Sequence, residues 1–208
     1  MSTDHLVMPE DHMEELYSSP NPLVKYVHGS RLDAIVKVLP LQEKLVVVDA
    51  GCGEGHLIEK LHGRFPNHAY IGLDATPVAL EKARTRCPYG DFRREDLTQL
   101  KLKSESVDVL ICTEVLEHIP EYQQVIREFK RVLKRDGTLI LTFPNETLWT
   151  VSRFLLGRKP IKVPDHVNSF SPSQMEKTVG LPLMKKKNLP FGLPFAVSLN
   201  GLLVFQKK

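Results

Sequence analysis

The sequence predicts an α/β fold in which a doubly wound, mostly parallel sheet carries helices on both faces. Two short apolar runs rich in β-branched residues, 45–48 and 107–112, are typical of strands buried on both faces. Segments of helical spacing separate these runs, and a glycine-rich turn follows the first of them. Strands joined through helices of this length require right-handed crossovers, so the sheet should be mainly parallel.

The elements alternate through the first two thirds of the chain. Apolar residues near helical spacing predict a first helix over 21–39, with Gly29 and Ser30 as a candidate interruption. Thr76 and Pro77 form a predicted cap and first helical position, and Gly137 should end a turn before a strand. We therefore expect strands at 45–48, 69–73, 92–94, 107–112 and 138–143, and helices at 54–62, 77–86 and 120–133.

The last third differs in composition. An apolar, helical stretch at 148–156 precedes the proline-studded segment 157–170, and Ser171 with Pro172 and Gln174 predicts a capped short helix. Two closing strands then predict an antiparallel hairpin at the sheet edge. We expect a single domain of 1–208, divided into an N-terminal helical cap (1–40), a core (41–145), a lid with a substrate insertion (146–180) and a closing hairpin (181–208).

Composition excludes several classes of protein. The chain has 208 residues, is 42% hydrophobic and 25% charged, and is long enough to bury a core without disulfides. The three cysteines, Cys52, Cys87 and Cys112, are odd in number and form no close pair, which argues against a disulfide framework or a zinc site. The N-terminus does not resemble a signal peptide, and no apolar run reaches the roughly 20 residues of a membrane span. We expect a cytoplasmic protein.

Charge is distributed unevenly along the chain. The net charge is +3, but residues 151–208 hold ten Lys or Arg against only Asp165 and Glu176, so the first 150 residues are net acidic. A basic section can bind an anionic partner such as nucleic acid, acidic lipid or a phosphorylated substrate. It can equally be a solvated face that aids solubility.

The turn after the first buried strand reads Asp49-Ala-Gly51-Cys52-Gly53-Glu-Gly55. Glycines between a strand end and a helix start allow a ligand to approach the backbone, and in open α/β sheets this crevice binds ligands. The third glycine falls two residues after the second, whereas the dinucleotide fingerprint requires three. The Asp49 carboxylate would repel a pyrophosphate and favour a cation.

Two further aspartates follow successive predicted strands. Asp74 lies 19 residues past Gly55, at a position from which a carboxylate accepts hydrogen bonds from ribose hydroxyls. Asp96 ends the third strand in the same way. A single aspartate there is usually a cap or a turn former, but three at successive strand ends predict a ligand site.

At this point the chain resembles the class I S-adenosylmethionine-dependent methyltransferases. The resemblance rests on VVVDAGCGEG, YIGLDAT, the acidic residue of REDL, VDVLICTEVLEHIP and VLKRDGTLILTFPN, which occur in the family's order over roughly residues 45–145. It implies a seven-stranded, Rossmann-like methyltransferase fold with an antiparallel last strand. It also implies S-adenosyl-L-methionine as cofactor and S-adenosyl-L-homocysteine as product.

The resemblance assigns cofactor contacts position by position. The glycine turn would admit the methionine portion, Asp49 would hold its ammonium, Asp74 would bind both ribose hydroxyls, and Asp96 with the Leu97 amide would contact the adenine edge. Residues 112–114 would pass beneath the cofactor. The full implied set is Asp49, Gly51, Cys52, Gly53, Gly55, Asp74, Ala75, Asp96, Leu97, Thr113 and Glu114.

Three residues are candidates for catalysis. If the chain is helical after the fourth strand, Glu114 and His118 share a face directed at the substrate. His166 lies in the segment expected to form the lid. We expect His118 and His166 as general-base candidates and Glu117 as a positioning group.

Within the family, TEVLEHIP and DHVNSF look most like the ubiquinone-biosynthesis O-methyltransferases and, more distantly, the small-RNA 2′-O-methyltransferases. In both groups a Glu-x-x-Glu-His run plus a distant His is associated with a divalent metal. Glu114, Glu117, His118 and His166 supply that set here, and such ligands suit Mg²⁺, Mn²⁺ or Zn²⁺. Similar runs occur in small-molecule methyltransferases without a metal, so we assign no metal from the sequence.

We therefore expect an enzyme that moves a methyl group to an oxygen or nitrogen of a small or lipid-like acceptor. The mixture of apolar and basic residues over 148–162 fits a helix on an anionic bilayer, but a helix that covers the active site is favoured. Peripheral membrane contact and the oligomeric state stay open.

The sequence is compatible with three alternative functions to different degrees. An RNA methyltransferase would use the basic section, but the chain lacks an RNA-binding module, and we do not expect nucleic acid as a partner. A non-catalytic cofactor-binding subunit would keep the three aspartates without turnover. A nucleotide-dependent oxidoreductase of the short-chain class would need a tyrosine with lysine four residues on, and no tyrosine in the chain has one.

Overall fold

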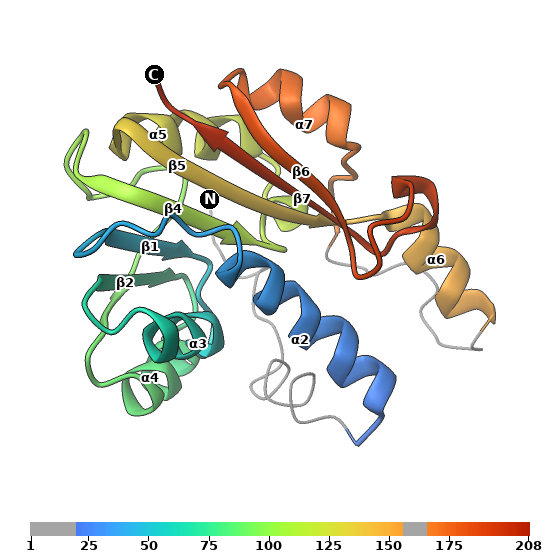
Figure 1. Ribbon diagram of the computed structural model, residues 1–208, viewed down its shortest axis with the longest axis horizontal. Coiled ribbons are helices and arrows are strands. Elements are labelled where there is room, and N and C mark those ends of the chain that lie inside the picture. The colour runs from blue at the N-terminus through green and yellow to red at the C-terminus, as the bar shows by residue number, and fades with distance from the viewer. Residues whose placement is uncertain (1–19, 156–165) are drawn as a thin grey trace.

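A computed structural model describes residues 20–155 and 166–208. Its centre is a seven-stranded sheet in the order β3-β2-β1-β4-β5-β7-β6 (Figure 1). The first five strands pair in parallel, whereas β7 runs antiparallel to β5 and β6 antiparallel to β7. The predicted doubly wound sheet, its antiparallel last strand and its closing hairpin are confirmed.

The elements follow the predicted order. The strands are β1 (Val46–Ala50), β2 (Ala69–Asp74), β3 (Asp91–Arg94), β4 (Val107–Thr113), β5 (Leu133–Pro144), β6 (Leu183–Leu189) and β7 (Asn200–Gln206). The helices are α2 (Pro22–Val36), α3 (His56–Arg64), α4 (Pro77–Arg86), α5 (Tyr122–Val132), α6 (Glu146–Leu155) and α7 (Pro172–Val179), with short 3-10 turns η1 (Leu116–His118) and η2 (Phe195–Val197).

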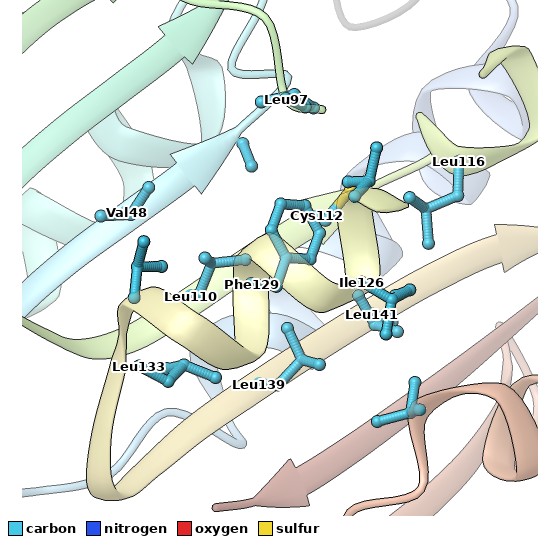
Figure 2. Close-up of a cluster of buried hydrophobic side chains, with 14 of the residues drawn as sticks. Val48, Leu97, Leu110, Cys112, Leu116, Ile126, Phe129, Leu133, Leu139 and Leu141 are labelled. Atoms are coloured by element: carbon cyan, nitrogen blue, oxygen red, sulfur yellow. The ribbon is translucent and has the colours of Figure 1, made fainter. Parts of the chain in front are cut away.

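Two apolar layers hold the sheet between its helices. On one face, side chains of β1, β4 and β5 pack against α5 and α7, with Phe129 of α5 fully buried among Leu110 and Leu139 (Figure 2). On the other face, α2, α3 and α4 contribute apolar residues such as Ile35 and Ile58 to a second cluster. Apolar burial on both faces explains why β1 and β4 are continuous apolar runs.

Helix α2 continues through Gly29 and Ser30 without the predicted interruption. The Ser30 hydroxyl donates to the Val27 carbonyl at 2.9 Å, so its polar group is satisfied within the helix. Burial of Leu32 and Ile35 against the body offsets the roughly 1 kcal/mol that a glycine costs inside a helix. Tertiary packing therefore overrides the local signal.

Two local expectations differ in detail. The Thr76 side chain makes no capping hydrogen bond, although α4 does begin at Pro77. The turn predicted before Gly137 exists as a bulge inside β5: β4 advances from Val107 to Val109 while β5 advances from Leu133 to Thr138. The predicted cap of α7 is confirmed, because the Ser171 hydroxyl accepts from the Gln174 amide.

Candidate functional site

The glycine turn after β1 lies at the carboxyl edge of the parallel strands and is tied to the neighbouring strand. The backbone amides of Gly51 and Cys52 donate to the Leu73 carbonyl at 2.7 and 3.0 Å. Gly51 has φ +84°, and a Cβ at this position would lie 2.2 Å from Cγ2 of Val115. The turn therefore requires glycine there, both for its conformation and for its close packing.

Asp49 and Asp74 bring two carboxylates to neighbouring strand ends, as the sequence predicts. Asp49 is 2% exposed, and burial, with a smaller contribution from Asp74, raises its pKa from 3.8 to about 7. The Asp74 carboxylate accepts from the amides of Gly53 at 2.9 Å and Thr76 at 2.8 Å, one on each oxygen. Each oxygen keeps a further lone pair that can accept from a ligand.

The other predicted cofactor positions differ in exposure and in their hydrogen bonds. The exposed Asp96 accepts from the amide and the hydroxyl of Thr98, whereas Leu97 is buried in the core. Burial raises the pKa of the Cys52 thiol well above its usual value, so the thiol is neutral at pH 7. The buried Thr113 hydroxyl makes no hydrogen bond within the described residues, and Ala75 is exposed.

Glu114 does not share a helical face with His118. It has φ +55°, and the only helical turn here begins at Leu116, so the conditional prediction of a shared face is wrong. Its carboxylate is directed across the sheet: Oε1 accepts from the Thr142 hydroxyl at 3.0 Å and Oε2 from the Asn200 amide at 2.7 Å. The Arg31 guanidinium of α2 lies 3.3 Å from Oε2.

This network joins three elements at one carboxylate. Burial raises the pKa of Glu114, and the positive charge of Arg31 opposes that shift. Because Arg31, Thr142 and Asn200 come from α2, β5 and β7, the end of β4 is fixed from three sides. Glu114 is therefore engaged by protein groups on both carboxylate oxygens.

The structure brings the three predicted catalytic residues together. One ligand atom each of Glu117, His118 and His166 lies within 4.8 Å of the others, and the two imidazole rings are 4.6 Å apart. Glu117 is 1% exposed, and neither of its side-chain oxygens has a hydrogen-bond partner among the described residues. Burial and, to a lesser extent, the charge of Glu114 raise its pKa well above the usual range.

His166 has a carboxylate partner that sequence reasoning missed. Its Nδ1 lies 2.6 Å from Oε1 of Glu146, the first residue of α6. A carboxylate only accepts hydrogen bonds, so this contact favours a proton on Nδ1, and in the neutral imidazole that tautomer has its lone pair on Nε2. The pair therefore resembles an oriented imidazole base.

Asn168 attaches the His166 segment to the η1 turn. Its side-chain amide donates to the carbonyls of Leu116 at 3.2 Å and Ile119 at 2.8 Å. The backbone amides of Val167 and Asn168 both donate to the Glu117 carbonyl, at 2.9 and 3.0 Å. Four hydrogen bonds thus hold the two histidine-bearing segments against each other.

The sequence analysis did not identify four residues in this region: Arg31, Glu146, Asn168 and Asn200. Each acts on a partner at least 20 residues away, so no local spacing reveals it. Asn168 lies within the DHVNSF segment that was singled out for His166, which was the only available signal.

A cavity of about 400 Å³ opens beside Glu146. It lies where the beginnings of α6 and α7 meet the loop between β6 and β7. Its lining includes Asn145, Glu146, Phe170, Ser171, Gln174 and Phe195. The cavity offers aromatic walls and a carboxylate next to the imidazole cluster.

Comparison with known proteins identifies related chains. The family described as "Methyltransferase domain" matches residues 48–141. A trans-aconitate 2-methyltransferase of Variovorax paradoxus is 31% identical over 107 residues, which cover 51% of this chain and 41% of that protein. The chain thus spans about two fifths of that relative's length.

Two further matches cover more of the chain. A ubiquinone biosynthesis O-methyltransferase of Actinobacillus pleuropneumoniae is 31% identical over 157 residues, which cover 70% of this chain and 66% of that protein. The crystal structure of magnesium protoporphyrin IX methyltransferase from Synechocystis, with bound S-adenosylhomocysteine, has a TM-score of 0.73 at 22% identity, covering 95% of this chain and 93% of its own.

Within the described residues, no helix is long and apolar enough to span a bilayer.

Proposed function

Since the chain belongs to the class I S-adenosylmethionine-dependent methyltransferases, we propose that it transfers a methyl group from S-adenosylmethionine to an oxygen or nitrogen of a small or lipid-like acceptor. The observation that carries the proposal is the pair of carboxylates, Asp49 and Asp74, beside a turn that only glycine can form. The cap (1–40) and the lid (146–180) would supply the acceptor walls around this core.

The donor set fits the cofactor. Among the described residues, no positive charge is paired with the buried Asp49 carboxylate, and an ammonium group of the cofactor would supply one. Asp74 keeps one lone pair on each oxygen for a ribose diol. The unpartnered Thr113 hydroxyl is a further donor at the end of β4.

When bound, the sulfonium supplies an already activated methyl group. The remaining work is to orient the acceptor and remove its proton. His166 would take that proton at Nε2, while Glu146 holds its Nδ1 proton and stabilises the resulting imidazolium. His118 is the second base candidate, and Glu117 would position both rings.

A divalent cation is a second candidate occupant of the imidazole cluster. In the part of the chain that the structure describes, the two buried oxygens of Glu117 have no hydrogen-bond partner, and two imidazoles lie within ligand reach of them. This combination of oxygen and nitrogen donors suits Mg²⁺, Mn²⁺ or Zn²⁺. Glu117, His118 and His166 would hold the ion, which would act as a Lewis acid toward an acceptor oxygen.

Calorimetric titration with S-adenosylmethionine tests the cofactor assignment. The wild type should bind, and Asp74→Ala should lose at least about 1.5 kcal/mol of binding free energy because it removes the charged acceptor. Asp91→Ala is the matched control, since Asp91 is an exposed residue of β3 whose carboxylate accepts from the Arg93 guanidinium. No binding to the wild type at millimolar cofactor would overturn the assignment.

A second experiment distinguishes a histidine base that acts without metal from a bound divalent cation. Metal content is measured for the wild type and for Glu117→Gln and Glu146→Gln after dialysis against each metal. A cation site predicts stoichiometric metal that Glu117→Gln loses and Glu146→Gln retains. An unaided base predicts no bound metal, and a loss of methyl transfer in Glu146→Gln with cofactor affinity unchanged.

A further inference from the structure

The loop between β6 and β7 is apolar and uncharged. No charged residue occurs from 189 to 205, and three side chains of the loop, Phe191, Leu193 and Val197, are exposed. Phe191 is 66% exposed. Exposing several large apolar groups on one short loop costs solvation free energy unless something covers them.

Two helices next to this loop expose apolar side chains as well. Tyr26 of α2 stacks on Phe191 with ring centroids 5.9 Å apart, and half of its surface stays exposed. Helix α6 begins beside the loop (Figure 1), because the Asn145 side chain donates to the Phe195 carbonyl. The helix exposes Val151 and Phe154. We call these six residues the apolar rim: Tyr26, Val151, Phe154, Phe191, Leu193 and Val197.

The apolar rim lies at the edge of the sheet that carries the site. Asn200, directly after the loop, bonds to Glu114, and Arg31, on the same helix as Tyr26, pairs with the same carboxylate. Phe195 of the loop also lines the 400 Å³ cavity that contains Glu146. The cavity and the apolar rim therefore belong to one end of the molecule.

Charge at this end favours an anionic surface. Lys25 precedes Tyr26 and is exposed, and Lys185 and Lys187 of β6 lead toward the loop. The loop itself carries no acidic residue. An anionic lipid surface would cover the apolar rim and bring an amphiphile next to the cavity.

We propose that the apolar rim docks on an anionic lipid surface and that the acceptor enters the cavity from that surface. The second half of this statement rests on the proposed methyl transfer, and the docking itself does not. The acceptor class is then an amphiphile with a hydroxyl or amine near its polar end, whose apolar part lies against Phe170 and Phe195.

Vesicle flotation of the full chain tests the docking. Vesicles of phosphatidylcholine alone are compared with vesicles that contain one third phosphatidylglycerol. The wild type should float with the anionic vesicles, and the double variant Phe191→Ser/Leu193→Ser should bind at least tenfold more weakly. Lys25→Glu should weaken binding severalfold at low salt and less at high salt, because screening reduces its contribution.

The control is Leu41→Ser. Leu41 is 83% exposed but precedes β1, at the amino ends of the parallel strands and away from the site, so its variant should float like the wild type. Each variant is first shown to be folded by its thermal transition and to bind S-adenosylmethionine like the wild type. If the wild type does not bind S-adenosylmethionine, the enzyme assignment is overturned, whereas the docking result still stands.

Three results would overturn the docking. The wild type could stay unbound with anionic vesicles, or Leu41→Ser could lose as much binding as the double variant. Alternatively, the wild type could sediment as a dimer that Phe191→Ser/Leu193→Ser converts to a monomer, which would assign the apolar rim to a second copy of the chain.

Discussion

Asp49 shows how one buried carboxylate links binding to stability. Folding moves its pKa from 3.8 to about 7, so the folded protein retains a proton that the unfolded chain releases. The associated stabilisation is fully present below about pH 4 and is lost as pH rises through 7. Without a bound cation, the site therefore opposes folding at alkaline pH.

Asp49→Asn should consequently separate the two properties. At pH 8 the variant should be more stable than the wild type in the absence of cofactor, by up to about 4 kcal/mol, because it has no buried charge to desolvate. At pH 4 the difference should vanish. Urea unfolding at both pH values measures this, and calorimetry should show weakened cofactor binding in the same variant. A variant less stable than wild type at pH 8 would contradict the assigned cause.

Gly51 and Gly29 provide a matched pair of glycines. Gly51 has φ +84° and no room for a Cβ, whereas a Cβ at Gly29, inside α2, would meet nothing within 4 Å. Gly51→Ala should cost about 1–3 kcal/mol of unfolding free energy and abolish cofactor binding. Gly29→Ala should add about 0.5–1 kcal/mol and leave binding unchanged. Urea unfolding measures the stability of each variant, and calorimetry measures its cofactor binding. Equal effects of the two substitutions would refute the argument from backbone conformation.

The η1 turn is an element too short to be stable alone. Its three residues carry Glu117 and His118, and its carbonyls are satisfied by a segment about 50 residues later in the chain. The position of these two side chains therefore depends on Asn168, which attaches η1 to the segment that carries His166.

Asn168→Asp tests this dependence with nearly constant side-chain volume. The change replaces two donated hydrogen bonds with oxygens facing the carbonyls of Leu116 and Ile119, which should cost about 1–3 kcal/mol of stability. It should also shift the imidazole titration curves of His118 and His166 measured by NMR. Asn188→Asp removes a single bond to the Leu193 carbonyl and should leave those curves unchanged. Unaltered histidine titration in Asn168→Asp would reduce Asn168 to a purely structural residue.

Cofactor binding should stabilise the whole molecule. With ligand at 100 times its dissociation constant, the folded state gains about 2.7 kcal/mol, which raises the unfolding midpoint of a domain of this size by about 5–11 °C. Scanning calorimetry with S-adenosylmethionine should show this rise in the wild type and a clearly smaller one in Asp74→Ala, because the variant binds the cofactor more weakly. An equal rise in both proteins would place the ligand away from Asp74.

The sequence predicted most of the fold and half of the site. Strands β1 and β4 were recognisable because apolar burial on both faces leaves a continuous run. Strands β6 and β7 were recognisable because a segment rich in proline and glycine separates them. The glycine turn, Asp49 and Asp74 were recognisable because strand ends meet at one edge. These are features that neighbouring residues encode.

What was missed depends on contacts between distant segments. Arg31 reaches Glu114 only because α2 packs on the body, and Glu146 reaches His166 across a gap of 20 residues. The predicted shared helical face of Glu114 and His118 was wrong because Glu114, directly after β4, has a left-handed backbone conformation. No neighbouring glycine marks that conformation in the sequence. The predictions for residues 156–165, including those for the basic Arg158, Lys159 and Lys162, lie outside the described residues.

The order of the strands has one more consequence, which concerns concentrated solutions. The two outer strands of the sheet, β3 and β6, leave backbone amides and carbonyls that another strand could pair with. Both are strongly charged: β3 reads Asp-Phe-Arg-Arg, and β6 contains Lys185, Lys186 and Lys187. Like charges meet when two copies of β6 approach each other, so the sheet resists growing into fibrils by edge-to-edge addition.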